Sequence, residues 1–132
     1  MNGPMTFELS GKTAIVTGAS SGIGEHLSRR LIQSDMRVIA TARRGDRLDA
    51  LAERLGSRLH PVVGDITDET TRRSVVDAAD GRLDLLVNNA GVGAIGPFAD
   101  AGADRLRKVM EVNFFAAVEL TRLAIPSLVA AE

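Results

Sequence analysis

The feature that most constrains this chain is a glycine-rich segment that follows a short apolar run. The run Ala14-Ile15-Val16 reads as a strand, and Thr17-Gly-Ala-Ser-Ser-Gly-Ile-Gly24 leads from it into a helical pattern. Glycines here permit a tight turn, a close approach of an anion to the backbone, and close packing of helix on strand. The free N–H groups at the positive end of the helix then face the anion. The segment predicts a pyrophosphate-binding loop whose ligand contacts are Gly18, Ser20, Ser21, Gly22, Ile23 and Gly24.

Apolar strand-like runs alternate with helical patterns along the sequence, which is typical of a parallel α/β sheet. We expect strands over 13–17, 37–41, 59–63 and 83–87, and helices over 22–34 and 48–55, after 67 and from about 104. Thr67 is the expected cap of the third helix. Right-handed crossovers favour the strand order 3-2-1-4. The prediction is one domain over 1–132 with a Rossmann-type, doubly wound but incomplete sheet and four helices.

The last expected helix carries an amide on its apolar face. Its stripe is Leu106, Met110, Asn113, Ala117, Leu120 and Ala124. A buried amide without a partner costs about 1–3 kcal/mol, so Asn113 is expected to be buried and to have a fixed partner, either structural or catalytic. Pro126 is expected to kink or end this helix, because it removes a backbone donor.

Composition excludes several kinds of function. With 16 basic and 17 acidic residues the net charge is -1, which gives no reason to expect nucleic acid or an anionic membrane as a partner. There is no cysteine, and His26 and His60 lie far apart, so no metal site is predicted. No apolar run approaches the ~20 residues of a membrane span, and the first ten residues do not form a secretion signal. A cytoplasmic location is therefore the expectation.

Two arginines, Arg43 and Arg44, follow the second expected strand. In a dinucleotide site this strand end meets the adenosine ribose, where arginine favours a 2′-phosphate and an acidic residue favours a free hydroxyl. Charge-assisted hydrogen bonds of about 1.5–3 kcal/mol each predict NADP(H) over NAD(H) by roughly ten- to a hundredfold. Ser20 and Ser21 offer hydroxyl donors to the same phosphate. The alternative is that both arginines are solvated turn charges.

Together these motifs resemble the classical short-chain dehydrogenases/reductases. The loop has the spacing T-G-x-x-x-G-I-G, and the sequence Asn88-Asn89-Ala90-Gly91 after the fourth expected strand matches the N-N-A-G of that family. The extended-type epimerases of the same superfamily usually have G-x-x-G-x-x-G, which these glycines do not fit. The resemblance covers nearly the whole chain. It implies a nicotinamide-dependent oxidoreductase that interconverts a carbonyl and an alcohol on a small-molecule substrate.

The resemblance also assigns roles to individual residues. It implies that Asp65 contacts the adenine edge and that Ile66 packs near the ring, the alternative for Asp65 being a simple turn. It implies that the motif containing Asn88, Ala90 and Gly91 braces the central strand and contacts the cofactor ribose. In the context Val112-Asn113-Phe114 it implies that Asn113 holds a water in a proton relay. A purely structural asparagine is the alternative there.

Part of the chemistry of the family has no counterpart in the sequence. The family uses a serine and a Tyr-x-x-x-Lys pair, whereas this chain has no tyrosine, and its lysines are Lys12 and Lys108. We expect the cofactor-binding half of a reductase, inactive alone, with at least two strands fewer than the family. Its fourth strand would then be an exposed edge, which predicts homo-oligomers. The alternative is a non-catalytic nucleotide-binding or assembly module.

Overall fold

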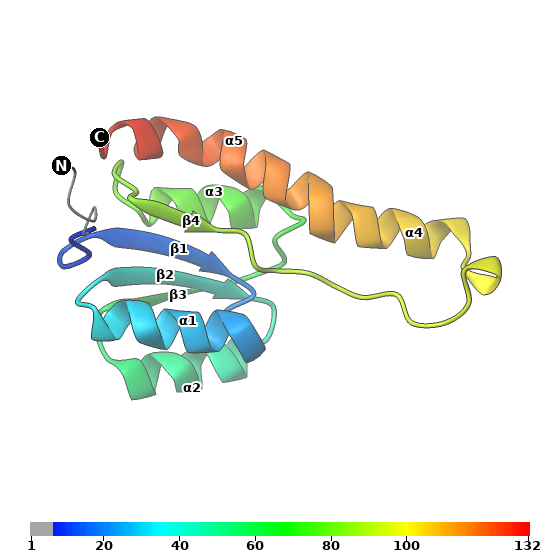
Figure 1. The fold of residues 1–132 in the computed structure, drawn as a ribbon, viewed down its shortest axis with the longest axis horizontal. Coiled ribbons are helices and arrows are strands. Elements are labelled where there is room, and N and C mark those ends of the chain that lie inside the picture. The colour runs from blue at the N-terminus through cyan, green and yellow to red at the C-terminus, as the bar shows by residue number, and fades with distance from the viewer. Residues whose placement is uncertain (1–6) are drawn as a thin grey trace, which may run out of the picture.

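A parallel sheet with helices on both faces forms the body of the protein (Figure 1). The computed structural model describes residues 7–132. The strands are β1 (Thr13–Thr17), β2 (Arg37–Ala42), β3 (Leu59–Val63) and β4 (Leu85–Val87). The helices are α1 (Gly22–Gln33), α2 (Gly45–Leu55), α3 (Glu69–Asp77), α4 (Ala103–Met110) and α5 (Ala116–Val129), with short segments η1 (Phe98–Asp100) and η2 (Glu111–Phe115). The strand order β3-β2-β1-β4 confirms the predicted doubly wound topology.

Each face of the sheet has its own hydrophobic core. Side chains alternate between the two faces of a strand, so Ala14 and Val16 pack toward α1 and α2, while Ile15 between them packs toward α3 and α5. All three residues are fully buried. The near-continuous apolar run of β1 is thus the run of a strand covered on both sides.

Several element boundaries differ from the sequence prediction, and at two of them a hydrogen bond explains the difference. Thr67 does not cap α3, whose N-cap is Asp68. The N–H and hydroxyl of Thr67 instead donate to the carboxylate of Asp65, at 3.0 and 2.8 Å. β4 begins at Leu85 and not at Leu83, because the Leu83 N–H donates to the carbonyl of Ser127 in α5 at 2.9 Å. In both places a tertiary or turn hydrogen bond replaces the expected local one.

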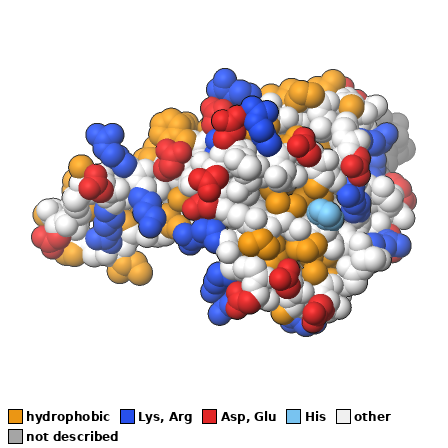
Figure 2. Space-filling model, turned by 180° about the vertical axis from the view of Figure 1, so that it is seen from behind, with side chains coloured by type: hydrophobic (Ala, Val, Ile, Leu, Met, Phe, Trp, Pro, Cys, Tyr) orange, Lys and Arg blue, Asp and Glu red, His pale blue; other side chains and the backbone are white. Residues whose placement is uncertain are grey.

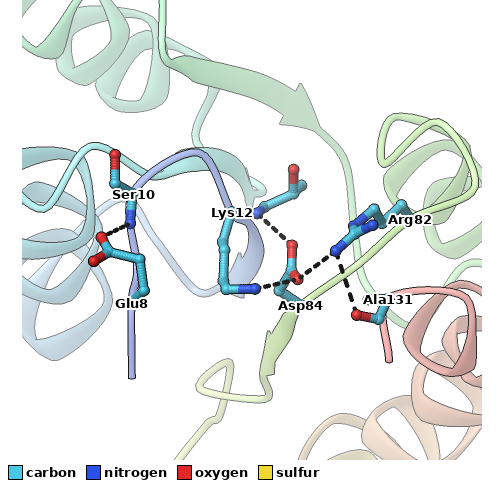
Figure 3. Close-up of polar contacts among 7 residues, drawn as sticks. Glu8, Ser10, Lys12, Arg82, Asp84 and Ala131 are labelled. Carbon is cyan, nitrogen blue, oxygen red and sulfur yellow. Dashed lines mark hydrogen bonds and ion pairs between the residues drawn. The ribbon is translucent and has the colours of Figure 1, made fainter. Parts of the chain in front are cut away.

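Asp84 joins the beginnings of β1 and β4 (Figure 3). Its carboxylate accepts from the Thr13 N–H at 2.9 Å and from Lys12 Nζ at 3.4 Å, and Arg82 lies 3.8 Å away. Arg82 also donates to the carbonyl of Ala131 at 3.3 Å. Burial raises the pKa of Asp84, but these donors and cations outweigh it, so the pKa lies below its ordinary value of 3.8.

Helix α4, η2 and helix α5 form one continuous helix of 27 residues, Ala103–Val129. Only its second half packs on the sheet, through Ala116, Leu120 and Ala124. The predicted stripe is wrong in the first half, where Leu106 and Met110 are 39% and 48% exposed. One cause is η2, a π-helical turn that shifts the apolar stripe around the helix. The other is that α4 projects beyond the sheet (Figure 1). Figure 2 shows this end as a narrow lobe with apolar, basic and acidic side chains.

Pro126 does not end this helix, and α5 continues to Val129. Pro126 has no N–H to donate to the carbonyl of Arg122, and both residues are exposed to solvent. Water can therefore satisfy that carbonyl.

By length and composition, the helix Ala103–Val129 could cross a membrane, since an 18-residue stretch of it has a mean hydropathy of 1.4. The expectation of no apolar run of this length concerned uninterrupted runs, and Glu119 and Arg122 interrupt the apolar residues of this helix. Core helices of soluble proteins pass the same test, although only 22% of this stretch is buried.

Candidate functional site

A cleft of about 280 Å³ opens where the carboxyl ends of the strands meet the long helix. Parallel α/β sheets place their ligand crevice at this position, where the strand order reverses. The cleft collects predicted residues from four separate segments of the chain. Those that line it are Gly18, Ser20, Ser21, Arg43, Arg44, Asp65, Ile66, Ala90 and Gly91.

Five predicted residues do not line the cleft: Gly22, Ile23, Gly24, Asn88 and Asn113. Ile23 lies at the start of α1 and is 77% exposed. The Asn88 amide donates to the Thr121 hydroxyl of α5 at 3.0 Å, on the side of a second, apolar groove.

The glycines of the loop have distinct local geometries. Gly18 has φ of +64°, and a Cβ there would lie 2.9 Å from the Cα of Ala90. At Gly24 a Cβ would lie 2.3 Å from the carbonyl oxygen of Gly18, so only glycine allows α1 to pack against the loop. Gly22 has φ of +55° and no atom within 4 Å of its Cβ position. The space over Gly22 is therefore open to an anion at the start of α1.

The first turn of α1 has no side-chain cap. Ser21 is the N-cap residue, but it makes no capping hydrogen bond. Its hydroxyl instead accepts from Arg44 Nη2 at 3.3 Å. The positive end of the helix is left for a ligand, and Arg44 and Ser21 are held side by side at the cleft.

A threonine and an asparagine join the two strand ends that border the cleft. The Thr17 hydroxyl accepts from the N–H groups of Asn89 and Ala90 at 3.0 and 2.9 Å. The Asn89 amide donates to the carbonyls of Thr17 and Gly18 at 3.1 and 3.2 Å. Asn89 therefore fixes the glycine loop against the segment after β4. Sequence reasoning did not select it as a site residue, although it is the second asparagine of N-N-A-G.

Asp65 presents a carboxylate to the cleft from the turn after β3. The Thr67 N–H lowers the pKa of Asp65 below its ordinary value of 3.8. Burial opposes this shift, while the Thr67 hydroxyl and the positive charges of Arg43 and Lys108 add to it. Asp65 is thus an ionised acceptor, suited to bind N–H or O–H donors.

Asn113 is not buried, contrary to expectation, but its amide has a fixed partner. Its Oδ1 accepts from the Val92 N–H at 2.8 Å, and its Nδ2 donates to the Val92 carbonyl at 2.9 Å. Asn113 lies in the π-helical turn η2, one of the distortions that proteins often place at functional sites. It ties the long helix to the loop that follows β4.

Further cleft residues were not selected from the sequence: Thr41, Ala42, Gly64, Asn89, Val92 and Val112. Most of them flank a selected residue. Thr41 differs, since its hydroxyl is buried and has no hydrogen-bond partner in the described part of the chain.

Comparison with known proteins gives consistent results. Residues 12–132 match the short chain dehydrogenase family. The 1-deoxy-11-beta-hydroxypentalenate dehydrogenase of Streptomyces avermitilis is 41% identical over 128 residues, which are 91% of this chain and 47% of that protein. Serine 3-dehydrogenase of Agrobacterium fabrum is 36% identical over 122 residues, 89% of this chain and 49% of that protein.

Solved structures agree with these relatives. The 3-ketoacyl-(acyl-carrier-protein) reductase of Brucella melitensis, complexed with NADH, matches with a TM-score of 0.86 and 31% identity over 90% of this chain and 51% of its own. L-sorbose reductase of Gluconobacter frateurii, complexed with NADPH and L-sorbose, matches with a TM-score of 0.84 and 32% identity over 94% and 51%. The chain spans about half the length of the relatives it matches. Over nearly its whole length, this chain belongs to the short-chain dehydrogenase family.

Proposed function

We propose that this chain binds NADP(H) and carries the cofactor-binding part of an oxidoreductase that interconverts a carbonyl and an alcohol. The observation that carries the proposal is the cleft itself, which brings the glycine loop, Arg43, Asp65 and Gly91 around one space at the carboxyl ends of the strands. The relatives complexed with NADH or NADPH support a nicotinamide dinucleotide as the ligand. When bound, such a cofactor exchanges a hydride with the substrate.

In this proposal each wall of the cleft binds one part of the dinucleotide. The open space over Gly22 and the uncapped end of α1 receive the diphosphate. Asp65 accepts from the adenine edge, and Ile66 packs against the ring. The segment from Ala90 to Gly91 gives room for the ribose next to the glycine loop. Asn89 keeps these walls at a fixed separation through its bonds to the loop carbonyls.

The preference for NADP(H) rests on the cations at the end of β2. Arg43 and Arg44 line the cleft, and Ser21 is already hydrogen-bonded to Arg44. Two guanidinium groups and a hydroxyl offer a donor set for a 2′-phosphate, and the position that follows β2 carries no acidic side chain to repel it.

We propose that Asn113 is a positioning residue at the end of the cleft where the reaction takes place. Its amide fixes the main chain of Val92 beside Gly91. For the enzyme as a whole, we propose that Asn113 also takes part in a proton relay. The sequence has no tyrosine, so we propose that the chain alone binds cofactor without transferring a hydride.

The test is a titration of the chain with NADPH and NADH, followed by the emission of the reduced nicotinamide. The chain has no tryptophan to interfere with that emission. Arg43→Asp is expected to weaken NADPH binding by roughly ten- to a hundredfold and to change NADH binding little, because it removes a charge-assisted phosphate contact. Arg47→Asp, the same charge change on α2 outside the cleft, is the matched control. Equal affinity of the unmodified chain for both cofactors would refute the preference for NADP(H), and no binding of either would refute the function.

We also propose that the chain self-associates. In the described residues, β4 pairs only with β1 and leaves its other edge free. β3, at the opposite edge, contains Pro61, which lacks a backbone donor and discourages further pairing. The groove beside β4 is lined by apolar residues of α5, including Val118 and Ile125. A second copy is the proposed occupant, because a free strand edge is complementary to itself around a two-fold axis.

A further inference from the structure

The turn Asp65-Ile66-Thr67, which follows β3, is held by two sets of hydrogen bonds. Within the turn, the Asp65 carboxylate accepts from the Thr67 N–H and hydroxyl. The Asp65 carbonyl also accepts from the Asp68 N–H at 3.0 Å. These bonds fix the shape of the turn, but they do not fix where the turn stands relative to the rest of the cleft.

Arg72 of α3 provides the second set of bonds to this turn. Its Nη1 donates to the carbonyls of Ile66 and Thr67 at 3.0 and 2.7 Å. The side chain is half-buried and is not part of the cleft lining. Its Nε is buried without a partner in the described part of the chain. The guanidinium is therefore held by the two turn carbonyls, and no ion pair of Arg72 occurs among the described residues.

Two positively charged side chains from other elements act on the carboxylate of this turn. Arg43 at the end of β2 and Lys108 on α4 both act on the Asp65 carboxylate through their positive charge. Lys108 lies one helical turn before Val112, which lines the cleft, so these two residues share a helix face. Without the bonds to Arg72, the Ile66 and Thr67 carbonyls lose their charged donor, and the turn keeps its own bonds, the bond of the Gly64 N–H to the Ala42 carbonyl and the packing of Ile66 in the core.

We propose that Arg72 is a positioning residue for the adenine end of the cleft. It touches no ligand, and it holds Asp65 and Ile66 where they meet the base. The inference rests on the proposed function, since it assigns the turn to the adenine. Nothing in the sequence pattern singles out Arg72, because it sits beside Arg73 in a helix of mostly polar residues.

The test compares Arg72→Met with Arg73→Met. Methionine keeps a long, flexible side chain and removes the donors. Arg73 is the matched control, because it is adjacent in α3, equally charged and bonded to Glu69 at the surface. ADP and inorganic pyrophosphate are the probes, and each is measured by its displacement of NADPH. ADP carries the adenine, whereas pyrophosphate reaches only the glycine loop.

We expect Arg72→Met to weaken ADP by roughly tenfold, as the loss of two hydrogen bonds implies, and to leave pyrophosphate unchanged. Arg73→Met is expected to change neither. Arg72→Lys, which keeps one donor group near the carbonyls, is expected to recover part of the loss, and it carries the same test if Arg72→Met does not fold.

Two results overturn the inference while the proposed function stands. One is an Arg72 variant that binds ADP as tightly as the unmodified chain. The other is an equal loss of ADP and pyrophosphate binding, which assigns Arg72 a general part in stability. Failure of the unmodified chain to bind ADP or NADPH is a different result, because it refutes the proposed function itself.

Discussion

At the scale of single residues, Gly24 is the position where the fold leaves no room for a side chain. Its Cβ would lie 2.3 Å from the carbonyl oxygen of Gly18 and 2.6 Å from Asn89 Nδ2. Neither neighbour can move freely, because one is loop backbone and the other is hydrogen-bonded to that loop. The first turn of α1 and the loop that precedes it are therefore positioned by the absence of one methyl group.

Gly24→Ala is expected to lower the free energy of unfolding by about 1–3 kcal/mol, the usual cost of overpacking. The substitution should also weaken NADPH binding, because α1 must move away from the loop. Chemical denaturation and the NADPH titration measure the two effects. Gly93→Ala is the control, since no atom lies within 4 Å of its Cβ position. Equal stability of the two variants would contradict the steric role of Gly24.

At the scale of elements, the sheet was predictable because each strand is a short, mostly apolar run flanked by polar or turn-forming residues. The bounds of β1 and β3 agree with the prediction to the residue. The helical stripe of 103–129 was predictable only in part. A spacing argument assumes 3.6 residues per turn, and the π-helical turn at Glu111–Phe115 breaks that assumption.

Residues of the candidate site were predictable where a local motif marks them. The glycine loop, Asp65 and Gly91 belong to such motifs, and the structure brings them to one cleft. Asn89, Thr41 and Arg72 were not selected, because what they do depends on partners far along the chain or on a tertiary cavity. The expected cap at Thr67 was wrong for a related reason, since the Asp65 carboxylate competes for its donors.

The junction of β1 and β4 predicts a dependence of stability on pH. The folded protein keeps the pKa of Asp84 below 3.8. The stabilisation is therefore complete above the unfolded-state pKa of about 3.9, and it is lost as the pH falls through the lower pKa of the folded state. Asp84→Asn should lose about 1–3 kcal/mol of stability at neutral pH, because it removes a charged acceptor that is only 10% exposed.

Denaturant titrations at several pH values measure this effect. The difference in stability between the unmodified chain and Asp84→Asn should shrink below pH 3.8. Asp80→Asn is the matched control, because Asp80 forms an exposed ion pair with Arg37 between β2 and the end of α3. A constant difference at all pH values would contradict the assignment.

At the scale of the whole molecule, most of the exposed large apolar side chains belong to the loop after β4 and to the long helix, between Ile95 and Val129. The free edge of β4 and the groove lined by Asn88 and residues of α5 lie in the same C-terminal part of the chain. Ile125 and Val129 are more than half exposed there. The α1 and α2 face, by contrast, is closed by its own core. Burial of apolar surface is the main favourable term in association, so contact between copies is expected on the β4 side.

Sedimentation velocity at increasing protein concentration should therefore show a larger species, and Ile125→Asp should shift its formation to roughly tenfold higher concentration by burying a charge at the contact. Ile95→Asp is the matched control, because Ile95 is 92% exposed in the loop beyond β4 and does not line the groove. A chain that stays monomeric at high concentration would refute self-association. If Ile95→Asp were as disruptive as Ile125→Asp, the contact would lie on the projecting lobe and not at the groove beside β4.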